Sequence, residues 1–212
     1  MCIRDRPRRK SILINSDNME EKQKFTGKGI HTFSDGSEYS GEFVNGKQEG
    51  YGIMTFANRD KYDGDWMNGL MDGQGKYYFY DNEKKTYNAF YKGQFVKGCR
   101  EGVGRMEYKN RDVYEGQWQN NFRTGNGVCW YANGDCYHGL WRFDKKIRGV
   151  FHKENGEKYD GEFIDGRIEG YGKYYWPDGK WYEGTFKDGK LYNGIVISPD
   201  GKISEYVNGI QM

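Results

Sequence analysis

The feature that most constrains the fold of this chain is a short phrase, Tyr-x-Gly-x-aromatic or a near match, that recurs seven times. Its copies follow one another at intervals of 22 or 23 residues, apart from one interval of 29, and begin at Tyr39, Tyr62, Tyr91, Tyr114, Tyr137, Tyr159 and Tyr182. A fixed period of this length is typical of repeat proteins, whose units bury a core only by stacking on their neighbours. The sequence therefore predicts an array.

A second phrase, Gly-x-Gly, follows most starts after eleven residues, as in Gly125/Gly127 and Gly170/Gly172. The fifth and seventh units depart from it by one residue and read Gly149-Val150-Phe151 and Gly194-Ile195-Val196. On this alignment the second glycine is missing at Phe151 and Val196. The second unit carries an insertion of six residues, which we expect to lengthen a loop near residues 80–90.

Asn-Gly and Asp-Gly pairs separate the phrases, as at Asn45-Gly46 and Asn133-Gly134. These residues tolerate the positive φ that two-residue hairpin turns require. Each unit is therefore predicted to be a β-hairpin with one strand around each phrase, and the fold class is all-β.

Side chains alternate between the two faces of a strand. This period predicts that Tyr114, Gly116 and Trp118 share one face, and that Gly125, Gly127, Cys129 and Tyr131 share one face of the next strand. The glycines then leave space for aromatic rings. The sixth unit repeats the pattern with Tyr159, Gly161, Phe163, Gly170 and Gly172.

The phrases divide the chain into two parts. Residues 1–24 are polar and basic and are expected to form a disordered tail, whereas residues 25–212 form the array. The array begins with a half repeat at 25–38, continues through the seven units, and includes a truncated eighth from residue 206.

Charge argues against nucleic acid as a partner. The first ten residues hold five of the 33 basic and one of the 31 acidic residues, so the remainder has a formal charge of −2. The apolar run from Ile12 to Ile14 is too short for a secretory signal, and the four cysteines lack a metal-type spacing. We expect a cytoplasmic protein with reduced thiols.

The two phrases resemble the MORN (membrane occupation and recognition nexus) repeat, with the best matches at residues 114–131 and 159–176. The resemblance covers the chain from about Phe25 onward. It implies an elongated, twisted, single-layer antiparallel β-meander. It also implies scaffold roles in cilia, membrane junctions and the basal structures of protozoan parasites, or an accessory role beside a separate catalytic domain.

The sequence predicts no enzyme, no cofactor and no metal site. The histidines, His31, His138 and His152, are scattered, and carboxylates that recur in every unit, such as Glu42 and Glu49, cannot all form one active site. We interpret these acids as a solvated row that pairs with Lys and Arg across strands.

Two surfaces stand out as candidate binding sites. One is a basic cluster that could attract anionic lipid, formed by Arg142, Lys145, Lys146, Arg148 and Lys153. The other is an aliphatic edge in the last unit, at which we predict a protein partner or a second copy of the chain, formed by Leu191, Ile195, Val196, Ile197 and Ile203.

The leading hypothesis is a non-catalytic scaffold that binds other proteins in a cytoskeletal, ciliary or axonemal assembly. The alternative is a peripheral membrane module that binds phosphoinositide headgroups. A third reading is the non-catalytic part of a larger enzyme.

Overall fold

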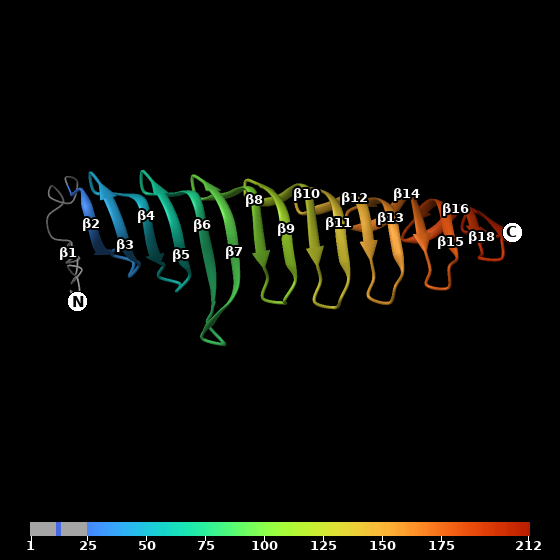
Figure 1. Ribbon diagram of the computed structural model, residues 1–212, viewed down its shortest axis with the longest axis horizontal. Helices are drawn as coiled ribbons and strands as arrows, with labels where there is room; N and C mark the ends of the chain where they lie inside the picture. The colour runs from blue at the N-terminus through green and yellow to red at the C-terminus, as the bar shows by residue number, and fades with distance from the viewer. Residues whose placement is uncertain (1–11, 14–24) are drawn as a thin grey trace, which may run out of the picture. The chain divides into compact units, whose positions relative to one another are not determined.

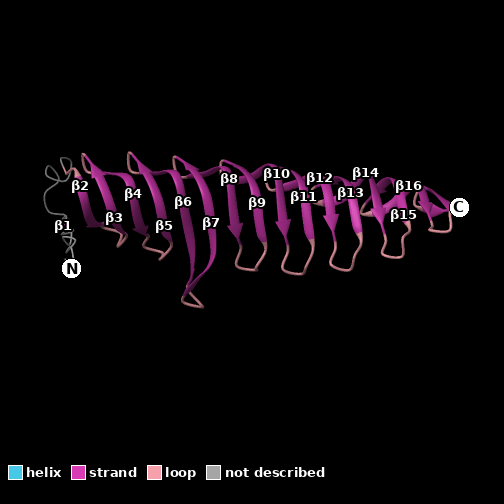
Figure 2. Ribbon diagram, in the orientation of Figure 1, coloured by secondary structure: helices cyan, strands magenta, loops and turns pink. Residues whose placement is uncertain are grey.

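The computed structural model describes residues 12–13 and 25–212, so most of the predicted tail, 1–24, lies outside the described residues. The chain divides into two compact units, residues 1–98 and 99–212, which we describe separately. Within the described residues every regular element is a β-strand (Figure 2).

The first unit is an antiparallel meander in which each strand from β2 to β7 pairs with the next along the chain (Figure 1). A short strand, β1 (Ile12–Leu13), pairs in parallel with β2. The other strands are β2 (Gly27–Thr32), β3 (Glu38–Val44), β4 (Lys47–Thr55), β5 (Lys61–Met67), β6 (Leu70–Asp81) and β7 (Thr86–Val96).

The second unit repeats this arrangement, with antiparallel pairing of consecutive strands from β8 to β18. Its strands are β8 (Cys99–Glu107), β9 (Val113–Gln119), β10 (Phe122–Trp130), β11 (Cys136–Arg142), β12 (Lys145–His152), β13 (Lys158–Ile164), β14 (Arg167–Tyr175), β15 (Trp181–Lys187), β16 (Lys190–Ile197), β17 (Ile203–Val207) and β18 (Ile210–Gln211). The predicted all-β fold of antiparallel hairpins is confirmed.

Two kinds of turn connect the strands. Turns within a repeat have two residues of positive φ, such as Asn45 (49°) and Gly46 (75°), whereas in turns between repeats only one residue does, such as Gly134 (92°). The two-residue interpretation is therefore wrong for pairs such as Asn133-Gly134. There a backbone hydrogen bond from Tyr131 to Asp135 closes a longer turn.

The insertion in the second repeat, which begins at Tyr62, extends two strands rather than a loop. β6 and β7 have 12 and 11 residues and meet in a short turn, so their hairpin extends past the neighbouring strands of the first unit (Figure 1). The loop prediction is wrong because the residues on both sides of the turn at 82–85 include aromatic side chains, Tyr77 to Tyr80 and Tyr87 to Tyr91, that favour strands.

A β-bulge marks the first glycine of most Gly-x-Gly phrases. In the fourth repeat, which begins at Tyr114, the pairing of β9 with β10 shifts between Thr124 and Gly127, and Gly125 has a φ of 53°. The inserted residue reverses the side to which Gly125 points, because a Cβ there would meet Gln117 rather than Tyr114. Gly125 and Gly127 therefore do not share one face.

The bulge also corrects the alignment of the fifth and seventh repeats. Gly149 pairs with Gly139, and Gly194 pairs with Gly184, in the same way that Gly127 pairs with Gly116. Gly149 and Gly194 are therefore the second glycines of their phrases. The fifth and seventh hairpins lack the first, bulge glycine, which shortens them by one residue.

Candidate functional site

The tyrosine that begins each repeat is buried on one face of the sheet. The seven side chains, Tyr39 to Tyr182, have at most 1% of their surface exposed. Tyr114 makes edge-to-face contacts with Trp118 of its own repeat and Trp141 of the next, both at 5.3 Å between ring centroids. Within each unit these contacts link successive repeats. We call this side of the sheet the aromatic face.

Glycine gives each tyrosine ring the space that it occupies. A Cβ on Gly127 would lie 2.4 Å from the Tyr114 hydroxyl oxygen, and one on Gly116 would lie 2.5 Å from it. The hydroxyl group donates a hydrogen bond to the Gln117 carbonyl oxygen at 3.0 Å. In the sixth repeat Tyr159 lies in the same way against Gly161 and Gly172, beside Phe163. Gly170, like Gly125, belongs to a bulge.

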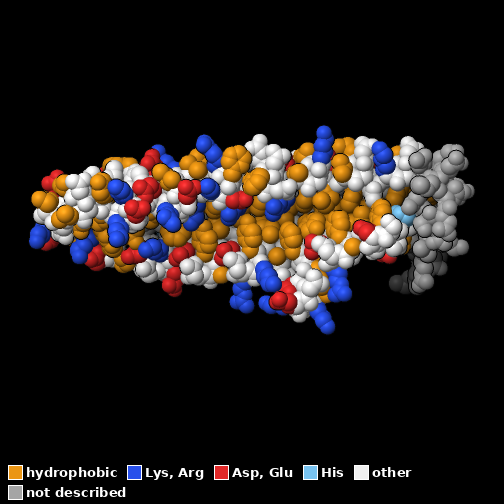
Figure 3. All heavy atoms as spheres, turned by 180° about the vertical axis from the view of Figure 1, so that it is seen from behind, with side chains coloured by type: hydrophobic (Ala, Val, Ile, Leu, Met, Phe, Trp, Pro, Cys, Tyr) orange, Lys and Arg blue, Asp and Glu red, His pale blue; other side chains and the backbone are white. Residues whose placement is uncertain are grey.

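Beyond the buried tyrosines, the aromatic face carries rings that remain half-exposed. In Figure 3 hydrophobic side chains form a band, with charged side chains along its borders. We call these rings the outer aromatic row; its members are Phe56, Tyr77, Phe79, Tyr108, Tyr131, Phe151, Tyr174 and Trp176. Ring contacts hold them in place, as between Phe56 and Tyr77 at 5.6 Å and Tyr174 and Trp176 at 5.1 Å.

In the second unit three cations lie on the aromatic face at one position of the repeat, nine residues after each start. The guanidinium of Arg100 lies 4.5 Å from the centroid of Trp118, and that of Arg123 lies 4.3 Å from Trp141. Arg123 also pairs with Asp144 at 2.8 Å. Sequence reasoning missed these arginines, although the repeat alignment would have shown their shared position.

Lys146 is the third of these cations and lies among aromatic rings. Its ammonium nitrogen is 4.4 Å from the centroid of Phe151 and 4.8 Å from that of Tyr131. Burial lowers the pKa of Lys146, because the charged form loses contact with water. Lys146 and these two rings line a hollow of about 440 Å³, and Asp112 and Asp135 lie at its border.

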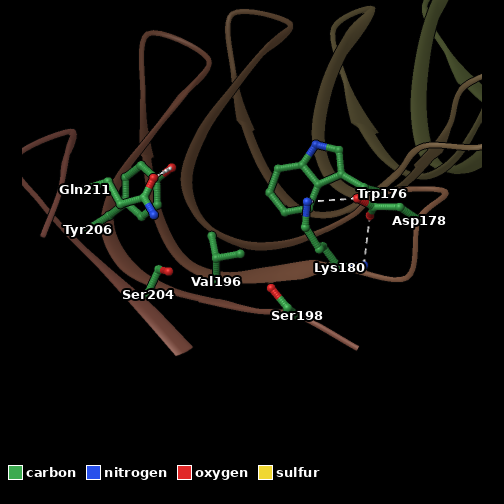
Figure 4. A pocket seen from close by; sticks show the side chains of 8 residues that line it. All are labelled: Trp176, Asp178, Lys180, Val196, Ser198, Ser204, Tyr206 and Gln211. Carbon is green, nitrogen blue, oxygen red and sulfur yellow. Dashed lines mark hydrogen bonds and ion pairs between the residues drawn. The ribbon is translucent and has the colours of Figure 1, made fainter. Parts of the chain in front are cut away.

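A second hollow lies beside Trp176, and Figure 4 shows its lining. It measures about 280 Å³ and is bordered by Val196, Tyr206 and Lys180. Lys180 pairs with Asp178 at 3.0 Å. Ser198, Ser204 and Gln211 also line this hollow, so most of the side chains around the indole ring are polar.

The predicted lipid cluster does not form one basic surface. Lys146 lies on the aromatic face near the start of β12, and Lys153 follows the end of β12, where it pairs with Glu157 at 2.6 Å. Lys145 pairs with Asp165, and Arg148 is opposite Glu162 on β13. Arg142, which pairs with Lys145 across the hairpin, is exposed.

The predicted aliphatic edge is likewise divided. β16 is not an edge strand, because β17 pairs along it. Val196 points to the aromatic face and lines the hollow of Trp176, whereas Ile195 and Ile197 alternate with it and point to the opposite face. Ile203 is 62% exposed and lies opposite Ile197, and Leu191 is half-buried.

The recurring carboxylates have a structural role that sequence reasoning missed. Glu162 accepts a hydrogen bond from the Tyr171 backbone N–H at 3.0 Å, beside the bulge at Gly170. Glu101 accepts one from the Asn120 backbone N–H at 2.9 Å and so joins neighbouring hairpins. These acids stabilise backbone rather than only pairing with Lys and Arg.

Among the described residues, no group of three or more His, Cys, Asp and Glu side chains could hold a metal ion. His31 is buried beside Phe33, whereas His138 and His152 are exposed. Within the part of the chain that the structure describes, no helix has the length and hydrophobicity needed to cross a membrane.

These features define the class of the protein as a β-hairpin repeat protein with an open antiparallel sheet. The chain belongs to the MORN repeat family, whose model matches residues 24–38, 39–61, 62–84, 91–113, 114–136, 159–181 and 182–191. The matches begin at six of the seven predicted starts. Residues 137–158, which form the fifth repeat and lack the bulge glycine, are not matched.

No curated protein matches the sequence. Among solved structures, the chain is similar to the TCP domain of SAS-4 (dCPAP) from Drosophila melanogaster, in complex with a proline-rich motif of Ana2 (dSTIL). The identity is 14%, the match covers 85% of this chain and 89% of that chain, and the TM-score is 0.44. The TCP10 domain of CPAP from Danio rerio, in complex with a STIL peptide, matches with 14% identity, 85% and 90% coverage and a TM-score of 0.39.

Proposed function

We propose that this protein is a non-catalytic scaffold whose aromatic face binds segments of other proteins. The observation that carries the proposal is the outer aromatic row, because its rings are fixed by neighbours yet remain half-exposed. Rigid aromatic side chains supply large contact areas at low entropic cost and are enriched at the centres of protein interfaces.

Lys146 adds a polar contact to this apolar surface. Its ammonium group lies at a hollow among rings, where water only partly solvates it. A carboxylate of a bound segment would pair with it in surroundings that strengthen the interaction. We therefore expect partners to combine apolar side chains with an acidic residue that reaches Lys146.

The finer proposal, a place in a cytoskeletal or ciliary assembly, rests on membership of the MORN repeat family. Any contact with other proteins through Ile195, Ile197 and Ile203 would use the opposite face of the second unit, so it would be compatible with binding at the aromatic face.

Selection of peptides on the complete chain tests the proposal. Peptides from a displayed library should bind the natural sequence and lose at least about tenfold in affinity when Phe151 and Trp176 are both replaced by alanine. The control is Tyr171→Ala, since Tyr171 is 51% exposed on the opposite face. Equal binding by the natural chain and the double variant would contradict the proposal.

The membrane alternative is separated by sedimentation with vesicles that contain phosphoinositides. The scaffold proposal expects no sedimentation above that with neutral vesicles. Sedimentation that disappears when Arg142 and Arg148 are replaced by glutamate, while peptide binding is absent, would favour the alternative.

A further inference from the structure

The extended hairpin of β6 and β7 carries a second group of aromatic rings, on the face opposite the aromatic face. Tyr78 alternates with Tyr77 and Phe79, which belong to the outer aromatic row. Its ring centroid lies 5.8 Å from that of Tyr87 and 6.5 Å from that of Phe90. Tyr80 lies 5.3 Å from Tyr87, which is 42% exposed. We call Tyr78, Tyr80, Tyr87 and Phe90 the hairpin cluster.

Cations surround the hairpin cluster. The ammonium nitrogen of Lys76 lies 3.7 Å from the centroid of Phe90 and 4.7 Å from that of Tyr78. Lys61 lies 5.4 Å from Tyr78, and the Arg59 guanidinium lies 5.5 Å from Tyr80. The rings attract these positive charges through their negative faces, so the surface is both aromatic and basic.

The charges at one repeat position distinguish this hairpin from the others. At this position two other strand pairs place a cation directly opposite a glutamate: Arg105 pairs with Glu115 at 3.3 Å, and Lys173 pairs with Glu183 at 3.0 Å. At the equivalent position of this hairpin, Lys76 is directly opposite Lys92. Like charges opposite each other destabilise a sheet.

The strand on the other side of β6 places one carboxylate opposite this pair, and that carboxylate has other partners. Asp63 on β5 is opposite Lys76, but it pairs with Lys61 at 3.7 Å and accepts a hydrogen bond from the Tyr51 hydroxyl group. Lys76 and Lys92 therefore form a pair of positive charges beside the hairpin cluster, of which Tyr87 is exposed and the other rings are half-buried. A carboxylate placed between them would supply the charge that Glu115 supplies to Arg105 and Glu183 supplies to Lys173.

We propose that the hairpin cluster, together with Lys76 and Lys92, binds an acidic segment of a partner protein that also carries an aromatic or aliphatic side chain. The carboxylate would pair with the two lysines, and the apolar side chain would contact Tyr87. This surface is distinct from the aromatic face, so a scaffold with both could hold two partners.

The test uses the complete chain and a labelled peptide that repeats Glu-Phe-Glu-Gly, with binding followed by fluorescence anisotropy. Lys92→Glu introduces the glutamate that two other repeats carry at this position, Glu115 and Glu183, and should weaken binding by at least about tenfold. It should also raise the melting temperature, because Lys76 gains an ion pair. Tyr87→Ser should weaken binding without unfolding the chain, and the matched control Lys47→Glu, an exposed lysine of the first unit, should bind like the natural chain.

Three outcomes would overturn the proposal. One is unchanged binding of the peptide by Lys92→Glu, and another is equal binding of a peptide in which lysine replaces each glutamate. The third is binding to phosphatidylserine vesicles without binding to the acidic peptide, which would assign the surface to membranes. Replacing Phe151 and Trp176 by alanine should leave binding of the acidic peptide unchanged. Failure of the proposal for the hairpin cluster is therefore distinguishable from failure of the scaffold proposal.

Discussion

At the scale of single residues, the fold depends on contact between tyrosine rings and glycine backbone. Tyr114 fills the space over Gly116 and Gly127, and its hydroxyl group reaches the Gln117 carbonyl oxygen. The spacing of the two phrases predicts that aromatic rings and glycines pack together. It does not show that the ring of each tyrosine covers a glycine on its own strand and one on the next.

Gly127→Ala tests this contact. The added Cβ would lie 2.4 Å from the Tyr114 hydroxyl oxygen, so either the ring or the strand must move. We expect a loss of about 2–4 kcal/mol in the free energy of unfolding, measured by denaturant titration. The control is Gly166→Asn, because a Cβ at Gly166 meets nothing within 4 Å and asparagine tolerates its φ of 81°. Equal stability of the two variants would contradict the packing.

At the scale of the hairpin, the glycine with positive φ and an acid or amide three residues after the tyrosine act together. The bulge at Gly170 leaves the Tyr171 backbone N–H for the Glu162 carboxylate, and the bulge at Gly125 leaves that of Asn126 for Gln117. The sequence shows these acids as a periodic row, but their partners depend on the bulge, which alternation of faces does not predict.

Glu162→Ala should therefore destabilise the protein. It leaves the Tyr171 N–H without its acceptor at 3.0 Å, and we expect a loss of about 1 kcal/mol in the free energy of unfolding. Thermal melting of the variant should be compared with that of Glu154→Ala, which removes an exposed side chain from a connecting turn. A melting temperature equal to that of the control would mean that the carboxylate is only a surface charge.

At the scale of the whole molecule, stability comes from contacts between neighbouring repeats. Tyr137 contacts Trp141 of its own repeat and Phe163 of the next, and Tyr159 contacts Phe163 and Phe186 in the same way. Each ring therefore belongs to two repeats, which explains why a single hairpin is not expected to fold alone.

This shared core predicts an alkaline limit to stability. Burial raises the pKa of Tyr137 to about 12 from an ordinary value of 10.0, and it also raises those of Tyr62, Tyr114 and Tyr159. A raised pKa favours the protonated form in the folded state, so the contribution of Tyr137 is full below pH 10 and is lost as the pH rises through about 12.

Ultraviolet absorbance of tyrosinate and circular dichroism, followed together during an alkaline titration, measure this limit. We expect the buried tyrosines to ionise only as the β-sheet signal is lost. Ionisation of all tyrosines near pH 10 with the sheet intact would show that the rows of rings are accessible to water.

The sequence by itself determined the period, the hairpin, the fold class and the family, because each depends on local spacing and on turn residues that repeat in every unit. Only the tertiary structure decided which residues share a surface. The bulge at Gly125 reverses one residue, and β17 pairs along β16. The register shift between β11 and β12 places Lys146 opposite Trp141 and Arg148 opposite Leu140, so these two members of the basic cluster point to opposite faces. A register shift of one residue changes the face of a side chain, and that shift depends on pairing with the neighbouring strand.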